Sequence, residues 1–361
     1  MRIWALISFC LILSSNAWAF PELTRHGYTQ CTACHFSPSG GGLLTPYGRQ
    51  LAAELLSTWS YKNEGRILHG LTENDLSERG VHLGGDVRAI QVHKKNKQFK
   101  YGRLFVMQAD FEVAYAQGPV VAAVSVGEIE NPTAERFEGN LNATSYYGLL
   151  NFSDHVALRA GRFLPQYGLN LPDHTVGIRS GLGFTPGYML DTLELSYLGE
   201  HWTGFAAQAR SLPSVGPEAA ELVRSAHLAY AFKGRYKLGF SHLYSEKGRQ
   251  SIDRLYGLNA ILGFSERFFS LLEIDTIHGT VKDSVFGYAR WGYEVVRGVV
   301  PYLQYERQHA DLRVTDGAAN HYIAGFNFFP RPHFELSGQW ARVRSTGAWG
   351  DQAYLMLHYY F

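Results

Sequence analysis

Apolar and polar residues alternate with a period of two through most of residues 81–361. In 333–343, for example, Phe334, Leu336 and Trp340 share one face, and the polar residues between them share the other. Successive side chains of a β-strand point to opposite sides, so this pattern predicts strands with one apolar and one polar face. A long series of such strands is typical of a barrel with lipid outside and water inside.

Turn-forming residues divide this region into sixteen expected strands, an even number, as bacterial outer-membrane barrels have. The strands are expected at 82–94, 103–117, 120–128, 142–152, 155–163, 190–200, 202–212, 223–233, 235–246, 252–264, 267–277, 283–296, 299–309, 319–329, 333–344 and 349–361. Short turns are expected after the even-numbered strands, at 117–119, 153–154, 200–201, 233–234, 265–266, 297–298 and 331–332, and the other connections are mostly longer. Barrels have short periplasmic turns and longer external loops, so we predict an all-β fold for 81–361, a 16-stranded antiparallel transmembrane β-barrel.

Composition agrees with this fold class. Aromatic residues make up 14% of the chain and charged residues 18%, and the net charge is +1. A disordered or nucleic-acid-binding chain would carry far more charge, so we expect no nucleic-acid partner. Tyr and Phe form the girdles of membrane barrels, so we expect the outer face to contact outer-membrane lipid.

Residues 1–19 have the features of a cleaved secretory signal peptide. Arg2 supplies the positive start, residues 3–13 are apolar, and Ala17-Trp18-Ala19 fits the small residues that precede a cleavage site. The apolar run is too short to span a bilayer as a helix. We therefore expect an exported protein of the bacterial outer membrane.

Residues 20–80 lack the alternation and contain Cys31-Thr32-Ala33-Cys34-His35. C-x-x-C-H is the attachment signature of a c-type haem, in which each thiol forms a thioether to the porphyrin and the histidine becomes the proximal iron ligand. The third cysteine, Cys10, falls within the signal peptide. We predict a partly helical segment that binds one covalent haem c through Cys31, Cys34 and His35.

Other interpretations fit a C-x-x-C pair alone. A thioredoxin-like redox pair needs a βαβ context, which the following residues do not show. A zinc site needs a second ligand pair at matching spacing, and a disulfide between these thiols would close a very small loop and stabilise little. A chance match is a further alternative, whereas haem attachment explains both thiols and the histidine together.

The second iron ligand is not marked by the motif. No Met lies between Cys34 and Met107, so a His/Met pair within 20–80 is excluded. The candidates near the motif are His26, His69 and His82. A five-coordinate or water-ligated iron is a further option. Two residues expected to point inward at the same rim are outer candidates, Met356 and His358, whereas Met107 is expected to face lipid.

Two further elements are expected around the haem. Thr45 and Pro46 suit the start of a helix, and Leu51, Leu55 and Trp59 follow at helical spacing, so this face could pack on the porphyrin or form an ordinary surface helix. The longest external connection, 164–189, should fold into the lumen, as the third loop does in the sixteen-stranded porins that this chain resembles. The expected lumen-facing charged residues are Arg88, Asp110, Glu112, Arg159, Glu273, Asp275 and Glu306. Their carboxylates could gather cations near the haem.

The signal peptide, the single C-x-x-C-H motif and the strands that end on Phe361 resemble the fused monohaem cytochrome c–porins. In motif, the resemblance rests on Cys31, Cys34, His35, Pro38 and Tyr47-Gly48-Arg49. The best-known members are outer-membrane iron oxidases. The resemblance therefore implies electron transfer through a haem at the periplasmic mouth or in the lumen.

Two functions follow as hypotheses. In the first, the barrel brings a small redox species or metal ion, such as Fe(II), to the haem. The electron then passes to or from a periplasmic c-type cytochrome or another carrier, which would make the protein an oxidoreductase acting on a metal ion. In the second, the barrel conducts solutes and the haem is a plug, sensor or structural anchor. A soluble haem protein with a β-domain is a third hypothesis, against which the regular turns argue. We find no catalytic triad, phosphate loop or spaced carboxylate pair that would indicate bond-breaking catalysis.

Overall fold

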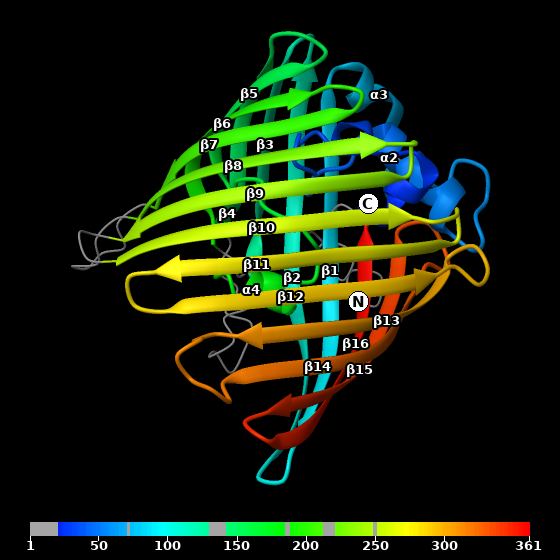
Figure 1. The fold of residues 1–361 in the computed structure, drawn as a ribbon. Helices are drawn as coiled ribbons and strands as arrows, with labels where there is room; N and C mark the ends of the chain where they lie inside the picture. The colour runs from blue at the N-terminus through cyan, green and yellow to red at the C-terminus, as the bar shows by residue number, and fades with distance from the viewer. Residues whose placement is uncertain (1–20, 71–72, 130–141, 185–187, 212–220, 248–250) are drawn as a thin grey trace.

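The computed structural model describes residues 21–70, 73–129, 142–184, 188–211, 221–247 and 251–361. These residues form one closed barrel of sixteen antiparallel strands with a short helical segment at its N-terminal end (Figure 1). The predicted fold class is therefore confirmed. The expected signal peptide, 1–19, lies outside the described residues.

The strands follow one another around the barrel in chain order. They are β1 Val81–Lys95, β2 Lys100–Gln117, β3 Val120–Ile129, β4 Asn142–Asn151, β5 Val156–Phe163, β6 Leu190–Leu198, β7 Trp202–Arg210, β8 Glu221–Phe232, β9 Tyr236–Lys247, β10 Ser251–Gly263, β11 Phe268–Gly279, β12 Asp283–Tyr293, β13 Val299–His309, β14 Ala318–Phe328, β15 Phe334–Ser345 and β16 Ala348–Tyr360. Every strand end lies within three residues of its predicted position.

The alternation in the sequence becomes an inside and an outside. In β8, Ser225 and His227 are buried toward the lumen, whereas Leu228 and Tyr230 are exposed on the outer face. The barrel is closed by β1 and β16, which pair antiparallel with Arg88 opposite His358. Closure leaves no strand edge with unpaired backbone groups, as a membrane-spanning sheet requires.

One side chain lies on the face opposite to the predicted one. Met107 lines a lumen pocket together with Arg88 and His358 and does not face lipid. The cause is a β-bulge, because the pairing of β1 with β2 shifts between Arg88 and Ala89, where β2 contributes an extra residue. One extra residue turns the side chains beyond it to the other face of the sheet.

The connections at one end of the barrel are all short, whereas those at the other end vary in length. All connections after even-numbered strands are short, as predicted, and this end is called the short-turn end below. At the opposite end, 130–141, 164–189 and 211–220 are long, but 96–99, 280–282 and 346–347 are short, so the expectation of mostly longer connections holds in part. The turn 96–99 joins β1 and β2, which have 15 and 18 residues and are the two longest of the sixteen strands.

The N-terminal segment, residues 21–80, lies at the short-turn end, where Figure 1 shows it in dark blue beside the C-terminal strand. Its elements are η1 Pro21–His26, η2 Cys31–Ala33, α2 Pro46–Leu51, the π-helical turn η3 Ala52–Leu56, η4 Ile67–Gly70 and α3 Glu73–Glu78. Backbone hydrogen bonds join it to the barrel rim: Thr58 N donates to Phe329 O at 2.8 Å, and Trp59 N donates to Pro330 O at 3.0 Å. Within the described residues, no helix has both the length and the apolar character needed to cross a membrane.

The loop after β5 folds into the lumen from the opposite end, as expected. Its short helix α4, Gly177–Ser180, has its first three residues buried, and residues 165–169 of the same loop are buried as well. Leu171, Val176 and Ile178 pack against Phe269 and Leu271 of the barrel wall, each at most 2% exposed. The lumen is therefore filled by protein from both ends.

Candidate functional site

Cys31, Cys34 and His35 lie on one tight turn of the N-terminal segment. The carbonyl of Cys31 accepts hydrogen bonds from the backbone N–H groups of Cys34, at 3.1 Å, and of His35, at 2.9 Å. This turn gathers the two thiols and the imidazole within a few residues of backbone. The thiols are free and do not form a disulfide.

A glycine run holds the ring of His35. Gly40, Gly41 and Gly42 have φ values of 77°, 74° and 62°, which glycine adopts without steric cost. Their turn brings the chain back so that His35 and Leu44 form an antiparallel bridge and Nδ1–H of His35 donates to the Gly42 carbonyl at 3.3 Å. Burial lowers the pKa of His35 to about 4, so its imidazole is neutral at pH 7. A neutral ring with Nδ1 hydrogen-bonded offers Nε2 to a metal.

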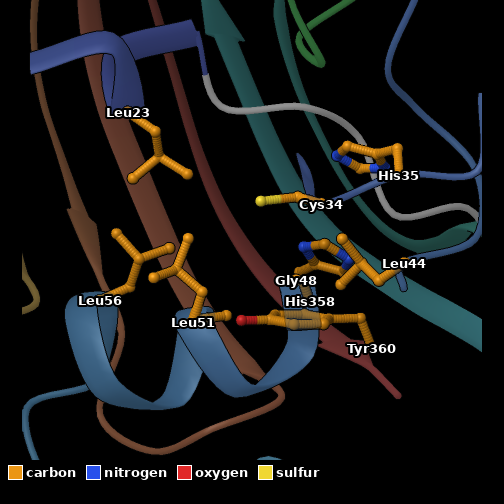
Figure 2. Close-up of a pocket in the computed structure, with 10 residues that line it drawn as sticks. Leu23, Cys34, His35, Leu44, Gly48, Leu51, Leu56, His358 and Tyr360 are labelled. Atoms are coloured by element: carbon orange, nitrogen blue, oxygen red, sulfur yellow. The ribbon is translucent and has the colours of Figure 1, made fainter. Parts of the chain in front are cut away.

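An apolar pocket of about 480 Å³ opens beside Cys34 and His35. Its walls include Leu23 of η1, Leu44, Leu51 of α2, Leu56 of η3, and two residues of β16, His358 and Tyr360. Figure 2 shows the sulfur of Cys34 pointing toward the cluster formed by Leu23, Leu51 and Leu56. A mostly apolar lining with a few polar groups is usual for cofactor pockets.

The helix beside this pocket begins as predicted and ends earlier. Thr45 caps α2 by accepting the Gly48 N–H at 3.0 Å. A Cβ at position 48 would lie 2.4 Å from the carbonyl oxygen of Cys34, so only glycine allows α2 to pack this closely on the motif. The helix ends at Leu56 with a π-helical turn, and Leu51 of α2 and Leu56 at the end of this wider turn both line the pocket. Leu55 is absent from that wall and Trp59 is 60% exposed, so the predicted face is wrong there.

A second, polar pocket of about 680 Å³ lies on the lumen side of the motif. It shares Leu23, Cys34 and His35 with the apolar pocket and is also lined by Cys31. Barrel residues complete it: Lys237 donates to the Thr29 carbonyl at 2.8 Å, and Asn259 has a buried amide nitrogen without a hydrogen-bond partner. The sequence analysis missed both residues, although their parity in the strands was the signal that they face the lumen.

Burial affects the thiols as well as the imidazole. It raises the pKa of Cys31 and raises that of Cys34 to about 11. Both thiols are therefore protonated near neutral pH, which is the opposite of a reactive thioredoxin-like pair, whose nucleophile has a lowered pKa. The redox-pair interpretation loses support, because burial of Cys31 outweighs the nearby Lys237 ammonium, which by itself would favour a thiolate.

The three predicted candidates for a second iron ligand lie outside both pockets. His26 accepts a hydrogen bond on Nε2 from Arg25 Nε at 2.9 Å. His69 has a positive φ of 55°, and its ring packs 4.8 Å from that of His333. The ring of His82 lies 4.7 Å from that of Phe36. The structure therefore does not bring any of the three beside His35 in a shared pocket.

His358, expected only as an outer candidate, lines the apolar pocket together with His35. Met356, two residues earlier, lies in a separate lumen pocket of about 640 Å³, which His358 also lines. His358 therefore forms part of the wall between the motif and the inner lumen.

These residues fit a covalent haem. Cys34 and the neutral imidazole of His35 line both pockets, and Cys31 joins them in the polar one. In that pocket the orphaned amide of Asn259 and the Lys237 ammonium offer donors for the carboxylates of a porphyrin. The described residues contain no group of three or more His, Cys, Asp or Glu side chains placed to hold a metal ion. One imidazole with a porphyrin matches this donor set better than a cage of protein ligands does.

The charged residues predicted to face the lumen are buried. Several of them bind the N-terminal segment or the loop after β5. Arg159 donates to Ser37 Oγ at 2.7 Å and to Ser39 Oγ at 2.9 Å, and pairs with Glu194 at 2.6 Å. Carboxylates predicted to face the lumen bind the loop: Glu273 accepts from Leu169 N at 2.7 Å. Asp275, Glu306, Arg88, Asp110 and Glu112 are also buried.

Comparison with known proteins shows which solved structures share this barrel fold. No family model and no curated protein matches the sequence. The solved structure of OprB of Pseudomonas putida is 10% identical, with 85% of this chain and 99% of OprB covered, and a TM-score of 0.63. An anion-selective porin of Comamonas acidovorans is 13% identical, with 78% and 99% covered, and a TM-score of 0.61.

A loop-deletion variant of OmpT of Vibrio cholerae is 10% identical, with 78% of this chain and 99% of that chain covered, and a TM-score of 0.60. This chain has the fold of outer-membrane porins. At these identities the likeness extends to the barrel and carries nothing about the motif at Cys31–His35.

Proposed function

We propose that this chain is an electron-transfer protein of the bacterial outer membrane. It carries one haem c, attached through Cys31 and Cys34 with His35 as proximal iron ligand, at the short-turn, periplasmic end of the barrel. The observation that carries the proposal is the cavity shared by the C-x-x-C-H turn and the leucines of η1, α2 and η3. The porin-like fold supports the membrane assignment, and the motif supports the cofactor.

When bound, haem c supplies reversible one-electron transfer at its iron. The residues of the chain bind it and control its surroundings. Gly42 orients His35, so that the neutral imidazole offers Nε2 as a ligand. Leu23, Leu51 and Leu56 exclude water from the pocket, and a dry site of this kind influences the reduction potential.

The partners follow from the two sides of this site. The lumen side would admit a small redox species or a metal ion, such as Fe(II), as the substrate. The other side would serve a periplasmic c-type cytochrome or another electron carrier, and the exposed rings of Tyr47, Trp59 and Tyr61 on the N-terminal segment suit such a docking surface.

A solute-conducting porin is the alternative, with haem as plug, sensor or structural anchor. The porin fold supports it. Against an open channel stands the packing of the lumen, where the loop 164–184 buries Leu171, Val176 and Ile178 against the barrel wall. A wide water-filled pore needs a lumen free of such packing.

One experiment separates the two functions. The full chain is expressed in cells that mature c-type cytochromes, and a pyridine-haemochrome spectrum is recorded on the outer-membrane fraction. We expect a c-type band in the wild type and none in C31A/C34A, while both barrels reach the outer membrane. A barrel without covalent haem contradicts the proposal. A large single-channel conductance in planar bilayers, unchanged in C31A/C34A, would favour the porin.

A further inference from the structure

His35 provides one iron ligand, and the residue on the other side of the iron has to come from elsewhere. Of the three histidines nearest the motif, His26 is bonded to Arg25, His69 packs on His333, and His82 lies against Phe36. None of the three lines the apolar or the polar pocket. Proximity in sequence is therefore a poor guide to the second ligand.

His358 of β16 lies in the same apolar pocket as His35. It lines the apolar pocket with Cys34 and His35 and is only 3% exposed (Figure 2). It approaches from the barrel wall, whereas His35 belongs to the N-terminal segment. A group held between these two bodies would contact an imidazole from each.

One hydrogen bond of His358 is of the kind that metal-bound histidines make. Its Nδ1–H donates to Glu335 Oε2 at 2.9 Å. Histidines that bind metals commonly donate their other ring N–H to a carboxylate, which fixes the ring and raises its basicity. Glu335 lies opposite His358 in the pairing of β15 with β16, so two regular strands hold this contact.

The other nitrogen of His358, Nε2, faces a carboxylate of β1. Nε2 is buried and lies 2.9 Å from Asp86 Oδ1, an ion pair when the ring is protonated. Asp86 is itself 3.3 Å from Arg88 Nε, so it keeps a cationic partner if His358 turns to another ligand.

We propose that His358 is the second axial ligand of the haem iron, with Glu335 as its positioning residue. This inference rests on the proposed function. The resulting pair of imidazoles predicts a six-coordinate low-spin iron. It also predicts a lower reduction potential than a His/Met pair would give, because a Met ligand raises the potential.

The test uses spectroscopy on the purified full-length protein. We expect low-spin ferric haem by electron paramagnetic resonance in the wild type, high-spin haem in H358A, and recovery of the low-spin signal when imidazole is added to H358A. H358Q preserves volume and a hydrogen bond to Glu335, and it gives the same high-spin result if H358A fails to assemble. E335Q should stay low-spin and shift the potential upward, because the ring loses its anionic partner.

Matched controls are H26A, H69A, H82A and M356L, which should all remain low-spin. A low-spin spectrum in both His358 variants, a high-spin wild type, or a switch to high-spin in a control would overturn the assignment. The pyridine-haemochrome spectrum replaces the axial ligands and reports covalent attachment alone. Absence of the c-type band in the wild type therefore rejects the proposed function, whereas a normal band with an unaffected H358A rejects only His358.

Discussion

Two segments enter the lumen of this barrel from opposite ends, the loop 164–184 and the N-terminal segment, and they are held there by different contacts. The loop 164–184 is packed dry, with Leu171 and Ile178 each at most 2% exposed against an apolar patch of the wall. The N-terminal segment is held mainly by polar contacts, such as Arg25 with Glu294 and Arg159 with Ser37, and it leaves an apolar and a polar pocket around the motif.

This difference distinguishes a loop that fills the lumen from a segment that leaves room for a ligand. Close packing leaves no volume for a cofactor, whereas anchoring through a few directional contacts holds a segment in place around a cavity. The loop should therefore respond most to loss of apolar volume. The N-terminal segment should respond most to loss of charge partners. The predictions below test this contrast, from the largest expected effect to the smallest.

The largest effect is expected at the buried ion pair that ties η1 to the barrel. Arg25 Nη2 lies 2.7 Å from Glu294 Oε2, with side-chain exposures of 1% and 8%. R25A leaves a buried carboxylate without its cation, which should lower the free energy of unfolding by about 3–5 kcal/mol. Urea unfolding and protease cleavage within 21–70 measure it. R235A, whose partner Glu266 is exposed, is the control. A change below about 1 kcal/mol in R25A would show that polar anchoring is not what holds the segment.

The next effect tests the dry packing of the loop. Leu171 is 2% exposed, and L171A should lower the free energy of unfolding by about 2–5 kcal/mol through lost burial and a residual cavity. It should leave covalent haem content unchanged. L312A, at an exposed leucine in another connection at the same end, should have little effect. Equal losses in the two variants would argue that the loop is loosely packed.

A third effect concerns pH at the junction of the segment with β15. His333 donates from Nε2 to the Glu64 carbonyl at 2.8 Å, and burial lowers its pKa to about 4. An unfolded histidine titrates near pH ~6.5, so the stabilisation is complete above that value and is lost as the pH falls toward about 4, by up to about 3 kcal/mol. H333Q should therefore show a shallower loss of stability between these pH values, measured by urea unfolding. H201Q, at an exposed histidine of the same rim, should match the wild type, and identical slopes in all three would refute the prediction.

The smallest effect is expected at an exposed contact of the segment. Arg331 Nε donates to Glu64 Oε1 at 3.0 Å, and its guanidinium lies 4.5 Å from the ring of Tyr61. Because water screens the exposed guanidinium, R331A should lower the free energy of unfolding far less than R25A does. R342A, which breaks an exposed pair with Asp351 at the opposite end, is the matched variant. A loss as large as that of R25A would mean that exposure is not what separates the two contacts.

Much of the barrel could be predicted because its signals are local. Alternation along each strand, and turn residues between strands, placed every strand end within three residues. The same locality explains Cys31 and His35, which a single turn brings together, and the cap at Thr45. The failures came where local periodicity was interrupted: the bulge turned Met107 inward, and the π-helical turn moved Leu56, not Leu55, into the pocket.

The second half of the site had no local signal. His26, His69 and His82 were favoured because they are near the motif in sequence, but hydrogen bonds and ring packing hold them elsewhere. Lys237 and His358 lie some 200 and 320 residues after His35 in the sequence. Both nevertheless line the pockets around the motif. The alternation of side chains along each strand predicts that both residues face the lumen. It does not predict that they lie beside the motif.

The sequence by itself therefore determined the strands, the even turns and the donor set Cys31, Cys34 and His35, because backbone geometry links residues a few positions apart. Only the tertiary structure decided what surrounds that set. Pairing of β1 with β16 closes the barrel and carries His358 to the pocket, and docking of the N-terminal segment in the lumen builds the rest of its wall. Such contacts depend on closure and packing in three dimensions, which no pattern along the chain records.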